Sequence, residues 1–174
     1  MKANMMQLDK AFETIMHSAF MTGSEEIPFA DSLNRILAED VYSDMDLPPF
    51  NKSMVDGFAC RKEDINHELE LIETIPAGTF PSKNISVDKC SKIMTGAPVP
   101  RGADYVFMVE DSKVLESGRI KCNVAASGDN ISKKGEDVRE GTVVLRAGKQ
   151  LRPQDIAVMA SVGKTSIAVI INRV

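Results

Sequence analysis

The chain has 174 residues, of which 43% are hydrophobic and 26% are charged, and its formal net charge at pH 7 is −4. These values are ordinary for a globular protein, and the length allows one or two domains with a buried core. No run of five like charges occurs, so a nucleic-acid surface, which needs clustered lysine and arginine, is not expected. No apolar run approaches membrane-spanning length, and the first ten residues lack the apolar core of a signal peptide. We therefore expect a cytoplasmic protein that binds neither membranes nor nucleic acids.

The cysteines and histidines give no sign of a disulfide or a zinc site. Cys60, Cys90 and Cys122 are far apart in the sequence and form no CxxC pair. Free thiols in a reducing compartment are the expected state. His17 and His67 have no partner at the spacing of metal ligands, so we expect both to be incidental helix or loop residues.

Apolar residues near the N-terminus recur with the spacing of one helix face. They are Leu8, Ala11, Phe12, Ile15, Met16, Ala19 and Phe20. This pattern predicts an amphipathic helix over residues 8–20 that ends before Gly23. Its apolar stripe has to be buried, either in the core of this chain or against another surface.

The next segment predicts a short helix and a strand. Pro28 suits the first turn of a helix that runs to about Leu33. Asn34 can close that helix in the left-handed conformation. Residues 36–42 then read as a strand.

Two adjacent prolines introduce a stiff loop at residues 48–59. Pro48 and Pro49 fix φ and remove two backbone donors, so neither a helix nor a central strand can pass through them. Asp56 and Gly57 predict a tight turn in which Gly57 can take positive φ. Asp56 is therefore expected on a rigid loop, either as a functional acid or as a cap of its own turn.

From there to residue 145 the chain alternates between short strands and turns. Strand patterns occur at residues 69–75, 104–109, 113–115, 120–124 and 143–145. The turn at 117–118 predicts a hairpin. The pattern then changes, because Pro153 opens a helix through Val162, Gly163 closes it, and a β-branched strand follows at 165–171.

These patterns predict a mixed α+β fold. An all-β domain of about residues 47–140 is inserted into a small α/β domain made of residues 23–46 and 141–174, and an amphipathic helix at residues 1–22 precedes both.

Three blocks of this sequence resemble the molybdopterin molybdenumtransferase family, which includes the E domain of gephyrin. The first is LPPFNKSMVDGFA at residues 47–59, and the second is IMTGAPVPRGAD at 93–104, followed by VED at 109–111. The third is GEDV at 135–138. The blocks have the order and spacing of the family, and the resemblance covers about residues 28–163. The molybdopterin-binding domain and the small C-terminal β domain of the family have no counterpart here, so we expect a truncated form of a longer protein.

The resemblance implies a transferase of molybdenum cofactor biosynthesis. Members of the family insert molybdate into adenylylated molybdopterin and release AMP, and they require a divalent cation. It further implies a homodimer whose active site lies between the β domain of one subunit and the molybdopterin-binding domain of the other. Mg²⁺ would then be bound mainly by the missing domain, and the 174 residues alone would be inactive. In the family the first helix packs on the molybdopterin-binding domain, so its stripe would here be exposed or covered by a second chain.

The matching motif positions provide the candidate site residues. Asp56, Thr95 and Asp137 are the catalytic candidates, and Ser53, Gly57, Gly96 and Glu136 are the substrate-binding candidates. The two aspartates would position a metal-bound water or the ligands of the incoming oxyanion, since carboxylates suit hydrated Mg²⁺. Thr95 would donate a hydrogen bond, and Gly96 would allow a close backbone approach. No residue is assigned as a metal ligand.

Alternatives to these assignments remain open. The segments around Thr95 and Glu136 could be plain turns, and Lys52 could either pair with Asp56 and lower its pKa or point into solvent. At the level of the whole chain, the alternatives are a non-catalytic dimerisation or scaffold module and a β-barrel ligand-binding domain. The sequence does not distinguish molybdate from tungstate.

Overall fold

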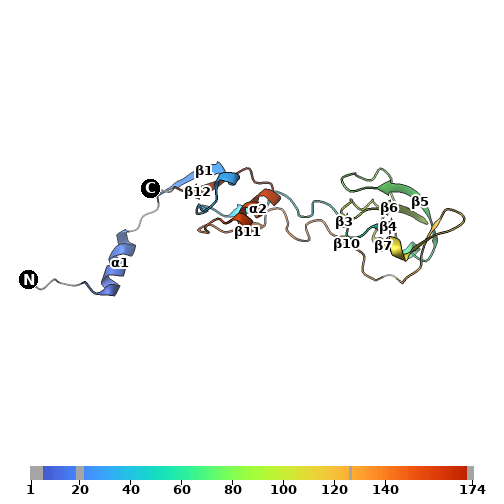
Figure 1. Ribbon diagram of the computed structural model, residues 1–174, viewed down its shortest axis with the longest axis horizontal. Coiled ribbons are helices and arrows are strands. Elements are labelled where there is room, and N and C mark those ends of the chain that lie inside the picture. The colour runs from blue at the N-terminus through green and yellow to red at the C-terminus, as the bar shows by residue number, and fades with distance from the viewer. Residues whose placement is uncertain (1–5, 19–21, 126, 172–174) are drawn as a thin grey trace, which may run out of the picture. The chain divides into compact units, whose positions relative to one another are not determined.

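The computed structural model describes residues 6–18, 22–125 and 127–171, and these confirm a mixed fold of helices and strands (Figure 1). The chain forms two compact units. Unit 1 combines the residues up to Val41 with those from Val143 onward, and unit 2 comprises Tyr42–Thr142. No helix within the described residues is both long and apolar enough to cross a bilayer.

Unit 1 pairs the two ends of the chain. Its elements are α1 (Leu8–Ser18), β1 (Ser24–Pro28), η1 (Phe29–Asp31), β11 (Val143–Leu145), α2 (Pro153–Ser161) and β12 (Ser166–Ile170). β1 and β12 form an antiparallel pair, and β11 pairs with β2 (Val41–Tyr42), where the chain leaves the unit. The core includes Leu37, Leu151, Met159 and Val169. α2 begins at Pro153 as predicted, and Asp155 closes its first turn by accepting the N–H of Arg152 at 3.0 Å.

Helix α1 leaves its apolar stripe open. The predicted amphipathic helix is confirmed as far as Ser18, while Ala19 and Phe20 lie outside the described residues. Leu8 is 84% exposed, Phe12 63% and Ile15 68%. Nothing in the described part of the chain therefore buries this stripe.

The segment between Gly23 and Val41 differs most from the prediction. Ser24–Pro28 is a strand that the sequence did not suggest, and the expected helix is a single 3-10 turn that does not reach Leu33. The expected strand at 36–42 is confirmed only at its end, Val41–Tyr42, whereas Ile36 and Leu37 form isolated bridges to different partners. The N–H of Leu37 donates to Lys149, and that of Ala38 donates to Ala168. Asn34 has the predicted left-handed backbone, with φ of 64°.

Unit 2 is built on a six-stranded sheet in the order β7-β4-β6-β5-β9-β8. Its elements are β3 (Lys52–Ser53), β4 (Gly57–Cys60), η2 (Lys62–Asp64), β5 (Glu68–Ile75), β6 (Lys89–Ile93), β7 (Tyr105–Met108), η3 (Val109–Asp111), β8 (Ser112–Val114), β9 (Ile120–Cys122) and β10 (Ile131–Ser132). β5 and β6 are parallel and the other neighbours are antiparallel. The predicted hairpin around residues 117–118 is confirmed as β8 and β9, and β3 pairs separately with β10.

The core of the sheet contains the three cysteines and two stacked rings. Phe58 and Phe107 stack with ring centroids 5.4 Å apart. Cys60, Cys90 and Cys122 are buried and free. Burial raises the pKa of the Cys90 thiol to about 12 and that of Cys60 further, so both stay protonated at neutral pH.

Gly57 is needed for packing rather than for a positive φ. The residue lies in β4, and its φ is outside the left-handed region, which corrects the expected turn geometry. A Cβ built on Gly57 would lie 2.0 Å from the carbonyl oxygen of Phe107, so no side chain fits there. This close approach allows β4 to pair with β7 at the start of the strand.

Candidate functional site

The carboxylate of Asp56 joins the first two sequence blocks. Its Oδ1 accepts one hydrogen bond from the N–H of Thr95 at 2.7 Å and another from the Thr95 hydroxyl at 2.9 Å. These bonds, the backbone one foremost, hold the pKa of Asp56 below its ordinary value of 3.8, and the charge of Lys92 adds to the effect. The pairing of Asp56 with Lys52 that the sequence left open does not account for this pKa. Asp56 is thus an ionised acid in a fixed orientation.

Main-chain hydrogen bonds hold the same two segments together. The N–H of Ser53 donates to the carbonyl of Ala97 at 3.0 Å, and the N–H of Gly96 donates to the carbonyl of Ser53 at 2.9 Å. Ser53 is only 1% exposed, and its hydroxyl donates to the carbonyl of Val55 at 2.6 Å. Gly96 has φ of 81° with open space beside it, so its backbone conformation is what requires glycine. The Thr95 turn is therefore a fixed structure rather than a loose loop.

Pairing of β3 with β10 brings the third block to the same place. Ser132 lies opposite Lys52 in this pair, and the turn after β10 leads to Asp137. The N–H of Asp137 donates to the carbonyl of Leu47 at 2.9 Å. Asp137 itself is exposed. A pocket of about 390 Å³, which we call the Asp137 pocket, results. It is lined by Lys52, Ser53, Met54, Thr95, Gly96, Ser132 and Asp137.

The structure gathers four of the seven predicted site residues around this pocket. These are Ser53, Thr95, Gly96 and Asp137. Asp56 reaches it through Thr95. Gly57 and Glu136 do not line it: Gly57 is buried in β4, and Glu136 accepts the N–H of Lys133 at 2.9 Å and so caps its own turn. The roles of all seven toward a substrate remain predictions.

Sequence reasoning did not assign Lys52, Met54 and Ser132 to the site. Lys52 and Met54 flank Ser53 within the first block, so their positions were available from the motif. Ser132 carries no local signal, because it reaches the pocket only through the pairing of β10 with β3.

The Asp137 pocket offers oxygen atoms and one ammonium group. Asp137 supplies a carboxylate, Thr95 and Ser132 supply hydroxyls, and Lys52 supplies a cation. Mg²⁺ in enzymes commonly binds one or two carboxylates together with substrate phosphate oxygens and water. The residues present fit a contribution of one or two ligands to such an ion and do not form a complete set.

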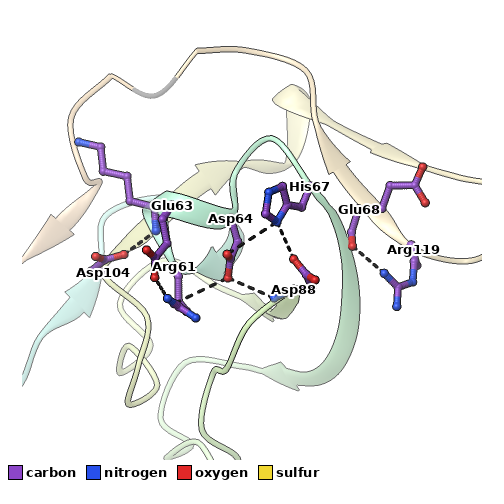
Figure 2. Close-up of polar contacts among 9 residues, drawn as sticks. Arg61, Glu63, Asp64, His67, Glu68, Asp88, Asp104 and Arg119 are labelled. Carbon is purple, nitrogen blue, oxygen red and sulfur yellow. Dashed lines mark hydrogen bonds and ion pairs between the residues drawn. The ribbon is translucent and has the colours of Figure 1, made fainter.

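A separate group of potential metal ligands lies elsewhere in unit 2. Within the described residues, Asp64, His67 and Asp88 place one ligand atom each within 4.8 Å of one another. Figure 2 shows that their side chains converge beside Arg61. His67 Nδ1 lies 2.6 Å from Asp88 Oδ1, and the buried Asp64 accepts the N–H of Asp88 at 3.1 Å and lies 3.7 Å from Arg61 Nε. These contacts make the group a hydrogen-bonded network beside the Arg61–Asp64 ion pair. His67 lies in a loop, as expected, but the sequence did not indicate its carboxylate neighbours.

Comparison with known proteins places these motifs in one family. Residues 6–163 match the family model described as the MoeA N-terminal region (domain I and II). A molybdopterin molybdenumtransferase from Staphylococcus aureus (strain Mu50) is 35% identical over 176 residues, which cover 97% of this chain and 42% of that protein. A protein of the same name from Bacillus subtilis (strain 168) is 35% identical over 174 residues, which cover 94% of this chain and 40% of that protein. The chain thus spans less than half the length of these curated relatives.

Solved structures show the same likeness. A molybdopterin biosynthesis MoeA protein from Pyrococcus horikosii matches with a TM-score of 0.85 at 33% identity, over 95% of this chain and 44% of that chain. A second one, from Pyrococcus horikoshii OT3, matches with a TM-score of 0.78 at 38% identity, over 87% of this chain and 42% of that chain. These matches confirm the resemblance that the three sequence blocks indicated.

The Asp56–Thr95 contact predicts a measurable titration. Because the hydrogen bonds favour the charged form, Asp56 should titrate below its ordinary pKa of 3.8. Thr95→Ala removes the hydroxyl bond and should move the pKa part of the way back, whereas Thr95→Ser should keep it low. The stability that this contact contributes should be present above pH 3.8 and be lost as the pH falls through the lowered pKa.

Carboxyl chemical shifts recorded by NMR across an acid titration measure this pKa in each variant. Asp56→Asn identifies the resonance. Equal pKa values in the wild type and in Thr95→Ala would show that the hydroxyl bond does not form in solution.

Proposed function

The chain belongs to the family of MoeA N-terminal regions, domains I and II, and on this basis we propose that it supplies one half of a molybdenumtransferase active site. The proposed reaction is the insertion of molybdate into adenylylated molybdopterin with release of AMP. The names of the curated relatives support the substrate class, since both are molybdopterin molybdenumtransferases. The free thiols of the described core support a reducing, cytoplasmic setting.

The observation that carries the proposal is the convergence of all three blocks on one pocket. Asp56 lies beside it, and Thr95 and Asp137 line it. Such fixed positions are what transfer chemistry needs, because holding reacting groups in place can lower a barrier by several kcal/mol.

The hydrogen bonds support separate roles for Asp56 and Thr95. The single hydroxyl proton of Thr95 points to Asp56 Oδ1, so the Thr95 oxygen presents lone pairs to the pocket and accepts a hydrogen bond from a water there. Asp56 Oδ1 already accepts two bonds, which leaves Oδ2 to orient a second water. The donor role that the resemblance implied for Thr95 would require this contact to open.

Asp137 and Lys52 line the pocket with opposite charges. Lys52 attracts the phosphate groups of the substrate, and Asp137 holds a water or one ligand position of Mg²⁺. When bound, Mg²⁺ would neutralise the phosphate charge that develops as the anhydride is cleaved. A carboxylate alone would repel molybdate, so Asp137 and Asp56 act on water and metal rather than on the oxyanion directly.

The remaining contacts to the pterin would come from outside this chain. The relatives extend well beyond the matched region, since the chain covers 42% of the Staphylococcus aureus protein. We propose that the half-site is preformed here and is completed by that further region of a partner subunit. Residues 1–174 alone should then neither cleave adenylylated molybdopterin nor bind it tightly.

Joining residues 1–174 to the further region of the Staphylococcus aureus relative tests this proposal. Once the wild-type chimaera inserts molybdenum, Asp56→Asn and Asp137→Asn should each lower kcat about 100-fold or more, because a positioned acid or base contributes on this scale. Thr95→Ala should have a smaller effect. The matched control is Glu140→Gln, which changes an exposed acid that lies outside the pocket.

Two results would count against the proposal. Wild-type rates in all three site variants would contradict the assignment of Asp56, Thr95 and Asp137 to the active site. Turnover by residues 1–174 without the added region would remove the half-site model.

We also propose that the chain forms a homodimer through α1. Contiguous exposed apolar faces mark interaction sites. Four apolar residues of α1 are more than half exposed: Leu8, Phe12, Ile15 and Met16. A non-catalytic dimerisation module is the alternative function that this observation favours. The transferase and the non-catalytic module would both dimerise through α1.

A double substitution on α1 tests the dimer. Phe12→Asp with Ile15→Asp places two charges in the stripe and should convert a dimer into a monomer of 19.0 kDa. Thr14→Asp places a charge on the polar face of the same helix and should leave the dimer intact. Light scattering over a concentration series measures the mass, and a wild-type chain that stays at the monomer mass throughout would contradict the proposal.

A further inference from the structure

The side chains of Asp64, His67 and Asp88, which we call the His67 cluster, bring a ring nitrogen together with two carboxylates. His67 Nδ1 lies 3.8 Å from Asp64 Oδ1 and 2.6 Å from Asp88 Oδ1, and the three side chains point toward one another (Figure 2). None of these residues lines the Asp137 pocket. The cluster is therefore a separate feature of unit 2.

Main-chain hydrogen bonds hold the cluster in place. The N–H of His67 donates to the carbonyl of Asp64 at 2.8 Å, which closes the turn after η2. On the other side, the N–H of Asp88 donates to Asp64 Oδ2 at 3.1 Å, and the carbonyl of Asp88 accepts the N–H of Glu70 at 2.8 Å. Side-chain rotation alone is then enough to surround an ion, and such preorganisation lowers the ordering cost of binding.

One oxygen of the buried carboxylate lacks a hydrogen-bond partner. Asp64 is 3% exposed, and its Oδ2 accepts the N–H of Asp88 and lies 3.7 Å from Arg61 Nε. Its Oδ1 accepts no hydrogen bond from the part of the chain that the structure describes, and it faces His67 Nδ1 at 3.8 Å. A buried carboxylate oxygen without a partner is costly. A cation between Oδ1 and Nδ1 would supply that partner.

The local charge also favours a cation. Arg61 divides its charge between Glu63 and Asp64, so it does not neutralise the carboxylate of Asp88 as well. The carboxylates around the cluster thus outnumber the guanidinium. The side chains of His67 and Asp88 are 53% and 47% exposed, which lets an ion enter from solvent.

The ligand types select a first-row transition metal. Ca²⁺ takes about six to eight oxygen ligands and Mg²⁺ also prefers oxygen, whereas an imidazole with carboxylates suits Zn²⁺ and its neighbours. Two ligand atoms of a tetrahedral Zn²⁺ are about 3.3–3.5 Å apart. The pair of His67 and Asp64 at 3.8 Å is close to this value. The pair of His67 and Asp88 at 2.6 Å has to open by less than about 1 Å, which the half-exposed Asp88 side chain allows.

We infer that the His67 cluster binds a divalent transition-metal ion such as Zn²⁺ through Asp64 Oδ1, His67 Nδ1 and Asp88 Oδ1. Water completes the coordination. Without the metal, Nδ1 donates its proton to Asp88, because a carboxylate can only accept. The metal replaces this proton, which leaves to water, and Nε2 takes up a proton from water in exchange. The inference does not depend on the proposed transferase reaction.

The ion would act as a clamp. It would join the turn after η2 to the turn that leads into β6, because Asp64 and His67 lie on the first and Asp88 on the second. A metal that binds only the folded chain stabilises it against unfolding. Zn²⁺ should therefore raise the Tm of residues 1–174.

Titration with ZnCl₂, followed by NMR of the histidine ring nitrogens, tests the inference on residues 1–174. Zn²⁺ should shift the Nδ1 resonance of His67 saturably, with a Kd of about 100 μM or below, and should leave the ring proton on Nε2. His17 on α1 is the only other histidine and serves as the internal reference. Mg²⁺ should bind at least about tenfold more weakly, because imidazole is a poor ligand for it.

Substitutions separate coordination from general attraction by charge. His67→Gln and Asp88→Asn should each weaken Zn²⁺ binding, measured by calorimetry, about tenfold or more. Neither side chain is buried, so both variants should fold. The matched control is Glu63→Gln, which removes an acid that contacts Arg61 and is no ligand. It should change the Kd less than about threefold. Zn²⁺ should raise the Tm of this control and leave that of His67→Gln unchanged.

Three results would overturn the inference. The absence of a saturable His67 shift up to about 1 mM Zn²⁺ would show that the cluster holds a proton and no metal. Equal Zn²⁺ affinity of the wild type and His67→Gln would place the ion elsewhere on the chain. Binding of Mg²⁺ as tight as that of Zn²⁺ would show that the carboxylates attract cations without coordination by the ring nitrogen.

Discussion

Two hydrogen bonds from Thr95 to a single oxygen of Asp56 hold together segments that are 39 residues apart. They are possible because β4 pairs with β6 so that Gly57 faces Ile93, which puts Asp56 next to the Thr95 turn. That pairing in turn depends on Gly57, where any side chain would collide with the main chain of Phe107. The position of the acid is therefore set by backbone packing in the sheet.

Backbone pairing also positions the third block. β3 carries Lys52 and Ser53 and pairs with β10, which leads to Asp137. One short extended segment thus links the first and third blocks, and a distortion of it should disturb the Asp137 pocket. Two adjacent prolines precede it and restrict the backbone there.

Much of the fold could be predicted from the sequence, and the failures have physical causes. Strands β5, β7 and β12 combine apolar runs with clear turn residues, so local pattern was sufficient. β1 is polar and exposed, and only its pairing with β12 makes it a strand. Within the site, motif order indicated Thr95 and Asp137, whereas the contribution of Ser132 arises from a strand pairing that no local spacing encodes. The same is true of the contact between His67 and Asp88 elsewhere in unit 2.

The central claim is that the half-site is already formed in residues 1–174, and amide hydrogen exchange tests it most directly. The account predicts that the N–H groups of Ser53, Thr95 and Gly96, each bonded within the site, are protected about as strongly as those of β4. Exchange of these three amides at the rate of an open loop, with β4 still protected, would show that the site forms only when a further region or a substrate is present.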